Sequence, residues 1–235
     1  SMFNGNMGDT ISDMRGIILV SDARNVESDD FEYHYYVSSA TTTNWPQNAV
    51  SLAWTFSQVY DYFKSVHGLT SLDDGTHNVT GIVNMGSEYN NAFWSGGIKL
   101  FCFGNGDGST FTDLAGSFDI AAHEYGHGVT QYGSNLEYQF QSGALNEAFS
   151  DFTGVMAEFY TDPDNGDWLI GEDCLPASSQ FNCLRNLSNP HHQQSMTSNY
   201  PSKMSEYADW TIEQDNGGVH RNSTIPGHAF YLMST

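Results

Sequence analysis

The first hundred residues alternate short apolar runs with polar, glycine-containing segments. Three runs rich in β-branched and aromatic residues, each bounded by Gly, Asn or Asp, predict strands at 16–20, 79–84 and 97–104. One helix interrupts them, because apolar side chains recur at helical spacing over residues 48–67 before Gly68 ends the series. This part of the chain is therefore expected to be mostly strand and loop.

The second half of the chain has apolar positions at helical spacing. Residues 118–131 and 143–160 predict two helices, and a third is expected over residues 220–233. We therefore expect an α+β chain, with a strand-rich lobe at 1–117, a helical lobe at 118–235 and a cleft between them.

The composition is that of a globular chain with a strongly acidic surface. Hydrophobic residues make up 39%, and no apolar run approaches the roughly 18 residues of a membrane span. Seven Lys and Arg face 28 Asp and Glu, which gives a formal net charge of -21. This charge argues against nucleic acid or an anionic membrane as a partner. It is compatible with a merely solubilising surface, with cation binding or with a high-salt habitat.

The three cysteines bear on the cellular compartment. Cys174 and Cys183 stand nine residues apart around a polar loop, so they could close a small disulfide in an oxidising compartment. Cys102 lies in an apolar run, where a buried inert thiol is expected. None of the three has the C-x-x-C spacing of a structural zinc site.

Residues 123–127, His-Glu-Tyr-Gly-His, have the H-E-x-x-H pattern. Residues four apart on a helix lie on one side of it, so His123 and His127 can bind one zinc ion through nitrogen. Glu124 projects close to the metal without having to bind it, and it can take a proton from a zinc-bound water. The alternative is that the two histidines only pack on a helix face.

A second predicted helix supplies carboxylates at a matching spacing. Glu147 follows His127 by 20 residues, room for a turn and an antiparallel return, and it would complete a ligand set of two His and one Glu. Asp151, four residues later on the same face, can accept the free N–H of a metal-bound histidine. The alternative is an ordinary solvated helix face.

Four motifs in the same order and spacing make the chain resemble the thermolysin family of metalloendopeptidases. They are 123–127, 143–151, 215–223 and the segment 89–94, which is similar to that family's substrate-edge strand. The resemblance implies a secreted zinc-dependent endopeptidase acting on peptide or protein substrates, with the zinc site on helices at the cleft. We expect a monomer. Because the family normally continues beyond the position of Thr235, the helical lobe is expected to be shortened.

The resemblance also implies roles for residues around the zinc. His220 would stabilise the oxyanion of the tetrahedral intermediate, with Asp215 orienting it, and Tyr138 would be a second donor. Asn146 and Asp151 would support the zinc ligands.

The same resemblance assigns substrate contacts. Those to the extended peptide main chain are expected from Asn91, Ala92 and Arg185. An apolar pocket for the residue after the scissile bond is expected from Phe111, Ile120 and Leu184. Because all three pocket positions are apolar, we expect cleavage on the amino side of a hydrophobic residue.

A calcium site is implied as well, because calcium needs six to eight oxygen ligands. The expected ligands are Asp119, Glu158, Asp167, Leu169 and Glu172. Leu169 stands where the founding member has an additional acidic ligand. We therefore expect one calcium ion, with the Leu169 carbonyl as a ligand, in place of a double site.

Competing functions have less support in the sequence. A metzincin is excluded because its third histidine would fall at Gly133, and no G-x-S-x-G marks a serine hydrolase. A catalytically inactive module, which binds zinc and a peptide or partner, is the alternative function. Glu124 and His220 argue against it, because neither is needed merely to hold zinc.

Overall fold

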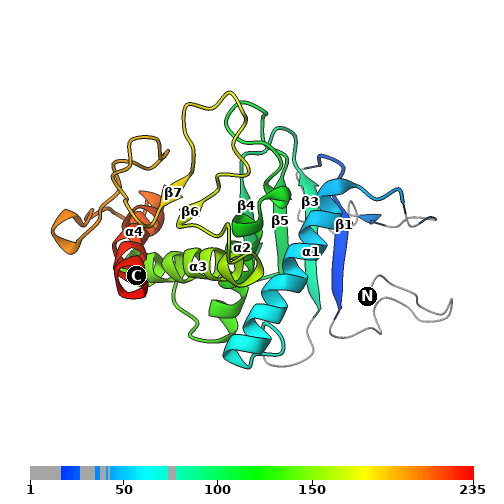
Figure 1. The fold of residues 1–235 in the computed structure, drawn as a ribbon, viewed down its shortest axis with the longest axis horizontal. Coiled ribbons are helices and arrows are strands. Elements are labelled where there is room, and N and C mark those ends of the chain that lie inside the picture. The colour runs from blue at the N-terminus through cyan, green and yellow to red at the C-terminus, as the bar shows by residue number, and fades with distance from the viewer. Residues whose placement is uncertain (1–16, 27–34, 38–40, 42, 74–77) are drawn as a thin grey trace.

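The structure is a computed structural model that describes residues 17–26, 35–37, 41, 43–73 and 78–235 (Figure 1). Strands predominate in the first half of the described chain and long helices in the second, so the predicted α+β fold is confirmed. Residue 16, where the first predicted strand begins, lies outside the described residues. None of the described helices combines the length and the apolar composition that a membrane-crossing segment needs.

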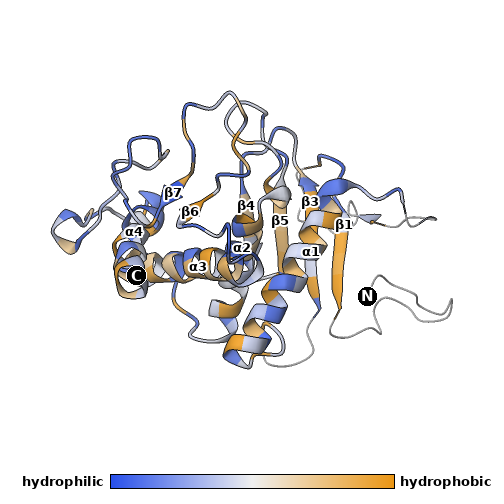
Figure 2. Cartoon of the chain, in the orientation of Figure 1, coloured by the Kyte–Doolittle hydropathy of each residue, from blue (hydrophilic) through white to orange (hydrophobic). Residues whose placement is uncertain are grey.

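The first half forms a five-stranded mixed sheet in the order β2-β1-β3-β5-β4. The strands are β1 (Ile18–Asp22), β2 (Tyr35–Tyr36), β3 (Val79–Met85), β4 (Ala92–Ser95) and β5 (Leu100–Gly104). The inner strands β1, β3 and β5 run parallel, and β2 and β4 lie antiparallel at the two edges. All five residues of β5 are buried, including Cys102, which agrees with the expectation for its thiol. Figure 2 shows the inner strands as mostly hydrophobic.

Helix α1 (Gln47–Tyr62) packs against the sheet and leads into a π-helical turn at Phe63–His67. This turn ends at Gly68, whose φ of 73° is the left-handed conformation that terminates helices. The predicted end at Gly68 is therefore correct, although the last turn is wider than an α-helix. Gly81 on β3 permits the close approach of α1, because a β-carbon there would lie 2.5 Å from Leu52 Cδ2.

Three long helices follow: α2 (Phe118–Tyr132), α3 (Phe140–Thr161) and α4 (Asp215–Ser234). They pack in sequence, α2 against the sheet and α1, α3 against α2, and α4 against α3. The third helix was predicted from residue 220. Asn216, Gly217 and Gly218 at the start of α4 have left-handed φ, so regular right-handed helix begins at Val219.

An aromatic cluster joins α2 to the sheet and to α1. The Phe56 ring lies 5.1 Å from the Phe101 ring and 5.8 Å from the Tyr125 ring, measured between centroids. Phe101 and Tyr125 stack at 5.9 Å. This core contains residues from both sides of position 117, and it fixes α2 on the sheet. The division into two lobes at residue 117 stays a prediction.

Short strands and loops complete the helical side of the molecule. Strands β6 (Leu169–Ile170) and β7 (Arg185–Asn186) form a two-stranded sheet, and neither was predicted. The segment 187–214 between β7 and α4 has only one short 3-10 turn, Met204–Glu206. The Asn222 side chain of α4 holds this segment by accepting from Ala208 N and donating to Ala208 O.

Candidate metal centre and cleft

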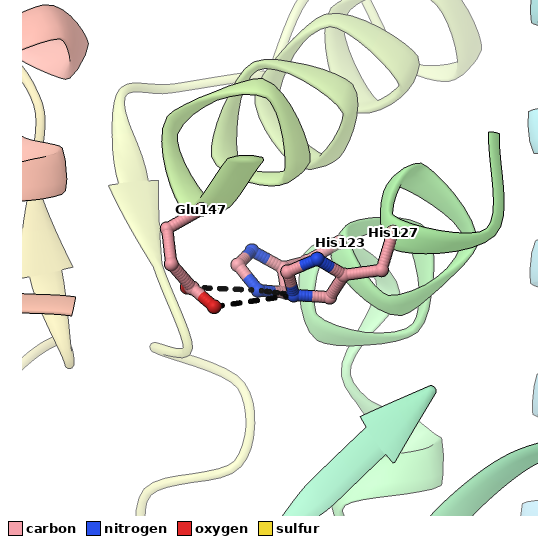
Figure 3. Close-up of side chains that lie close together, drawn as sticks. All are labelled: His123, His127 and Glu147. Carbon is pink, nitrogen blue, oxygen red and sulfur yellow. Dashed lines mark hydrogen bonds and ion pairs between the residues drawn. The ribbon is translucent and has the colours of Figure 1, made fainter. Parts of the chain in front are cut away.

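Two histidines from α2 and one glutamate from α3 converge in the interior (Figure 3). Nε2 of His123 lies 3.1 Å from Nε2 of His127 and 3.5 Å from Glu147 Oε2. Nε2 of His127 lies 3.3 Å from Glu147 Oε1. The helices can approach this closely because Gly126 has no side chain, and a β-carbon there would lie 2.9 Å from Ser150 Cα.

The hydrogen bonds behind the histidines orient their lone pairs. His123 Nδ1 lies 2.8 Å from Asp151 Oδ1, and His127 Nδ1 lies 2.7 Å from Asn146 Oδ1. Asn146 donates its amide nitrogen to Leu136 O, which fixes the amide orientation and makes Oδ1 the acceptor. Both Nδ1 atoms therefore carry the proton in the neutral rings, and both Nε2 lone pairs face the Glu147 carboxylate.

This donor set fits a zinc ion. Two nitrogen lone pairs and a carboxylate converge, with no proton to share between the two neutral rings, so a cation is the natural partner. Tetrahedral zinc with ligand bonds of ~2.0–2.1 Å separates its ligand atoms by roughly 3.4 Å. The observed separations of 3.1 to 3.5 Å agree with this geometry.

Asp151 and Arg185 form a buried ion pair behind the metal centre. Asp151 accepts from Arg185 Nε at 2.9 Å and from Nη2 at 2.7 Å, in addition to His123. Burial disfavours the charged carboxylate, but Arg185 and His123 outweigh it and hold the pKa of Asp151 below its usual value. Arg185, which is expected to contact substrate, also lines the cleft. Its guanidinium is therefore bonded to Asp151 and still adjoins the space where substrate would bind.

A cleft of about 780 Å³ opens above the metal ligands. Its lining includes all the residues expected to bind substrate or catalyse, together with the expected zinc ligands and Asn146: Asn91, Ala92, Phe111, Ile120, His123, Glu124, His127, Tyr138, Asn146, Glu147, Leu184, Arg185, Asp215 and His220. Glu124 is only 6% exposed, and its Oε2 has no hydrogen-bond partner among the described residues. A buried carboxylate oxygen without a partner at a cleft wall is available to accept a proton.

Tyr138 and His220 enter the cleft from different elements and meet at Glu147. The Tyr138 hydroxyl donates to Glu147 Oε1 and lies 3.2 Å from His220 Nε2, which is 3.3 Å from the same Oε1. Burial and the Glu147 carboxylate raise the pKa of Tyr138, so the phenol stays protonated. On its other side, His220 Nδ1 lies 2.5 Å from Asp215 Oδ1.

Charge favours the protonated form of His220. Burial lowers its pKa, but the carboxylates of Glu147 and Asp215 outweigh burial, and the net effect is a raised pKa. An imidazolium held by Asp215 through Nδ1 presents an N–H donor at Nε2. The arrangement therefore points two donors, one O–H and one N–H, at the same region of the cleft.

Strand β4 forms one rim of the cleft and is an edge of the sheet. It pairs with β5 through Ala92 and Phe103, and no described strand lies on its other side. Asn91 precedes β4, and its carbonyl accepts from Gly104 N at 3.0 Å. Among the described residues, its side chain makes only a long contact of 3.5 Å, from Nδ2 to the Tyr89 hydroxyl.

The three residues expected to form an apolar pocket lie together in the cleft wall with Leu114 and Cys174. A β-carbon on Gly171 would lie 3.0 Å from Leu184 Cβ and 3.5 Å from Ile120 Cδ1, so this glycine brings the two side chains together. Cys174 and Cys183 are free, buried thiols in this structure and do not form the disulfide that their spacing permitted.

A second group of carboxylates lies away from the cleft. Oxygens of Glu158, Asp167 and Glu172 come within 4.8 Å of one another. Burial, with the nearby charges of Asp119 and Asp167, raises the pKa of Glu158 to about 8 and that of Glu172 to about 9. Such crowding suits a hard cation such as calcium.

The other two residues expected at this group, Asp119 and Leu169, have polar contacts of their own. Asp119 is buried, and its carboxylate accepts from Ser117 Oγ and from the backbone N–H groups of Ile120 and Gly171. Leu169 donates its N–H to Asp167 Oδ1 at 2.7 Å. Asp173 was not anticipated, and its charge acts on both Asp119 and Glu158.

Part of the cleft wall was missed from the sequence. Thr197, Tyr200 and Trp210 line it from the segment 187–214, where no short motif marks them. Gln131 also lines it and accepts from Trp94 Nε1 at 2.7 Å. Its position four residues after His127, on the same helix face, was a signal that could have identified it.

Comparison with known families agrees with this geometry. Residues 4–131 match the family described as thermolysin metallopeptidase, catalytic domain, and residues 134–235 match thermolysin metallopeptidase, alpha-helical domain. Together these matches cover almost the whole chain.

Individual relatives are similar to the chain over most of its length. Thermostable neutral protease NprT of Geobacillus stearothermophilus is 40% identical over 193 residues, 82% of this chain and 33% of the relative. Thermolysin of Alicyclobacillus acidocaldarius is 41% identical over 79% of this chain and 32% of the relative. The chain thus spans about a third of the length of these curated relatives.

A solved structure is similar as well. The precursor of protealysin, a metalloproteinase from Serratia proteamaculans, superimposes with a TM-score of 0.81 at 32% sequence identity. The match covers 97% of this chain and 71% of that one.

Proposed function

Because the chain belongs to the thermolysin family of metallopeptidases, we propose that it is a zinc-dependent endopeptidase that cleaves on the amino side of hydrophobic residues. The observation that carries the proposal is the convergence of His123, His127 and Glu147 beneath a cleft that also receives Glu124 and His220. The first three residues would hold the zinc. The last two offer a base and a donor, which metal binding alone does not need.

Zinc, when bound, supplies Lewis acidity that polarises a carbonyl and lowers the pKa of a water molecule. Glu124 is the proposed general base and proton carrier. Its unpartnered Oε2 supports this role, because a free carboxylate lone pair can take the proton of the attacking water. The same carboxyl can then give that proton to the leaving amine nitrogen.

Tyr138 and His220 are the proposed oxyanion donors. Asp215 holds Nδ1 of His220, so that Nε2 faces the cleft beside the Tyr138 hydroxyl. A donor aimed at developing negative charge in a water-poor site is typically worth ~3 kcal/mol of transition-state stabilisation.

Substrate is proposed to bind as an extended strand along the free edge of β4. Asn91 and the Ala92 backbone would contact its main chain, and this mode is supported by the edge of β4, beside which no described strand lies. The apolar wall of Phe111, Ile120 and Leu184 would receive the residue after the scissile bond. Arg185, whose Nε and Nη2 serve Asp151, would bind a substrate carbonyl through its remaining N–H groups.

We also propose one structural calcium ion. Glu158, Asp167 and Glu172 would be its carboxylate ligands, because their oxygens already crowd within 4.8 Å. Asp119 and the Leu169 carbonyl would complete the set, in keeping with the high coordination number of calcium.

The proposed setting is extracellular, with a monomer acting on peptides or proteins. The formal charge of -21 supports the absence of a nucleic-acid partner, because phosphate contacts need Lys and Arg.

Cleavage of an internally quenched peptide with Leu or Phe after the scissile bond tests the function. Purified protein of measured zinc content is assayed with and without a zinc chelator, and the products are mapped by mass spectrometry. The proposal expects chelator-sensitive cleavage before the hydrophobic residue. Absence of cleavage at one zinc per chain would refute it and favour a non-catalytic zinc module.

A Glu124→Gln variant separates the base from the metal site. The amide keeps the size of the carboxylate but cannot take a proton, so kcat should fall about 10²- to 10⁴-fold. Zinc content, measured by atomic absorption, should stay at one per chain. Retained activity in this variant would contradict the role of Glu124.

A further inference from the structure

Phe140, the first residue of α3, has an unusual backbone. Its φ is 51°, in the left-handed region that glycine adopts freely and bulky residues rarely enter. The residue is 43% exposed, so its burial contributes only part of what a core phenylalanine would. An outlier of this kind persists only where its surroundings impose it.

A second left-handed segment lies directly against Phe140. Asp215, Asn216, Gly217 and Gly218 have φ of 52°, 49°, 85° and 78° in succession. This segment carries the Asp215 carboxylate and leads into His220. Asp215 lines the cleft, and the proposed oxyanion donors Tyr138 and His220 are close in sequence to these two left-handed segments.

Each segment has a glycine against which a side chain of the other segment packs, and we call this pair of contacts the interlock. A β-carbon on Gly217 would overlap the Phe140 ring at Cδ1, so the ring rests on the bare backbone of Gly217. A few residues on, a β-carbon on Gly143 would overlap Val219 Cγ1. These two contacts fix residues 138–143 against residues 215–220.

The interlock sets the spacing of two donors. Tyr138 stands two residues before Phe140, and His220 stands three residues after Gly217. Their Oη and Nε2 atoms lie 3.2 Å apart, and both reach Glu147 Oε1. A shift of the Phe140 ring on Gly217 would change the distance between these donors without touching a metal ligand.

We propose that Phe140 is a positioning residue whose ring, seated on Gly217, holds Tyr138 and His220 at the separation needed to bind one oxyanion. The inference rests on the proposed peptidase function for the identity of that oxyanion. Phe140 is not among the described residues that line the cleft, so its effect should fall on turnover and not on substrate binding.

Replacement of Phe140 by Gly is the decisive variant, because Gly removes the ring and also suits the left-handed backbone. Full loss of one oxyanion donor typically costs 10²- to 10³-fold in kcat, so displacement of both should cost about 10-fold or more. KM should change less than about twofold and zinc should stay at one per chain. Relief of the backbone strain offsets the lost packing of the partly exposed ring, so the melting temperature should change little.

Phe140→Tyr is the matched control. It keeps the ring on Gly217, so kcat within about twofold of the parent chain is expected. Should the Gly variant fail to fold, Phe140→Asn serves in its place, because Asn tolerates the left-handed region and also lacks the ring. Equal kcat in the ring-less and ring-bearing variants overturns the proposal. So does a fall in kcat that comes with lost zinc or a lower melting temperature.

A binding measurement keeps this inference separate from the proposed function. Calorimetry compares a phosphoramidate peptide, whose tetrahedral anionic group mimics the oxyanion, with a product-like peptide that lacks it. Phe140→Gly should weaken the phosphoramidate about 10-fold and leave the product peptide unchanged. If the parent chain cleaves no peptide, the proposed function fails and this comparison still decides the role of Phe140. Equal effects on both ligands would refute it.

Discussion

Asp151 lies beneath the metal ligands and makes two kinds of contact at once. It accepts from His123 Nδ1 at 2.8 Å and from Arg185 Nε and Nη2 at 2.9 and 2.7 Å. The carboxylate has no exposed surface, so its charge is tolerated only because both partners are present. At the scale of single residues, the metal centre and the buried ion pair are therefore one unit.

Replacement of Asp151 by Asn is expected to lower both the zinc affinity and the stability of the fold. Loss of the carboxylate behind a metal-bound histidine typically lowers metal affinity 10- to 100-fold. The Arg185 guanidinium would stay buried without a counter-ion, and breaking such a pair typically costs ~3–5 kcal/mol. Zinc affinity is measured by competition with a chelating dye, and the free energy of unfolding by urea denaturation.

The double variant Asp151→Asn with Arg185→Met provides the control. It removes the unpaired charge, so most of the stability should return while zinc affinity stays low. Parental zinc affinity in the single variant would contradict the role of Asp151.

At the scale of elements, α2 is wedged between the sheet and α3, and glycines decide how closely it packs. A β-carbon on Gly126 would meet the Ser150 backbone, Cα at 2.9 Å. A β-carbon on Gly128 would meet only side-chain ends, Phe101 Cζ at 3.0 Å and Leu72 Cδ2 at 3.1 Å. Side-chain ends can shift by a few tenths of an ångström, whereas backbone in a packed helix cannot.

Alanine substitutions should therefore have opposite outcomes at the two glycines. Each gains about 1 kcal/mol of helix propensity. Gly126→Ala also forces α2 and α3 apart, and such overpacking costs roughly 1–3 kcal/mol, so net destabilisation is expected. Gly128→Ala should be neutral or stabilising. Urea denaturation of both variants measures the difference, and a less stable Gly128→Ala would contradict this account.

The three clustered carboxylates come from two parts of the chain, Glu158 from α3 and Asp167 and Glu172 from the segment that contains β6. Calcium should raise the melting temperature by neutralising this crowded charge, and a calcium chelator should reverse the effect. Glu158→Gln should reduce the calcium response, because one ligand charge is lost. The metal-free variant should be at least as stable as the metal-free parent, because repulsion is relieved. Scanning calorimetry with and without calcium measures both melting temperatures. If calcium raises the melting temperature of the variant as much as that of the parent, Glu158 is not a ligand.

The sequence predicts many of these elements, and the elements that it does not predict were missed for physical reasons. The long helices and inner strands bury continuous or periodic apolar faces, so hydrophobic spacing predicts them. Strands β2, β6 and β7 have two residues each, which is too short for any period. Helical spacing predicts that His123 and His127 share one face, and the 20 residues to Glu147 leave room for a returning helix; the three side chains lie close together in the structure. The positions of Tyr200 and Trp210 depend on tertiary contacts of an irregular segment, and no local pattern encodes them.

The whole molecule carries a formal charge of -21 with only seven basic residues. Of these, Arg185 is committed to the buried Asp151, so few cations remain to offset surface repulsion. Self-repulsion destabilises a compact state, and it is screened over ~10 Å at 0.1 M salt and ~3 Å at 1 M.

Monovalent salt should therefore stabilise the chain. With calcium saturating, raising sodium chloride from 0.05 to 1 M should increase the melting temperature by several degrees, since 1 kcal/mol corresponds to about 2–4 °C at this size. The variant with Asp61→Asn and Asp164→Asn, both exposed positions, should show a smaller increase. A melting temperature independent of salt in the parent would show that repulsion is unimportant.

The free edge of β4 has a consequence for which proteins this chain can attack. On the proposed function, the substrate becomes a sixth strand of the sheet, so about half a dozen of its residues must first leave their own secondary structure. Proline at a position that must donate an N–H to β4 would be rejected whatever its neighbours. A tightly folded target would be cut only as fast as it locally unfolds, so cleavage rates would report on the stability of the target. The chain would then cleave misfolded and denatured proteins in preference to folded ones. Its first requirement would be an extended backbone, and the side chains of the target would matter only after that.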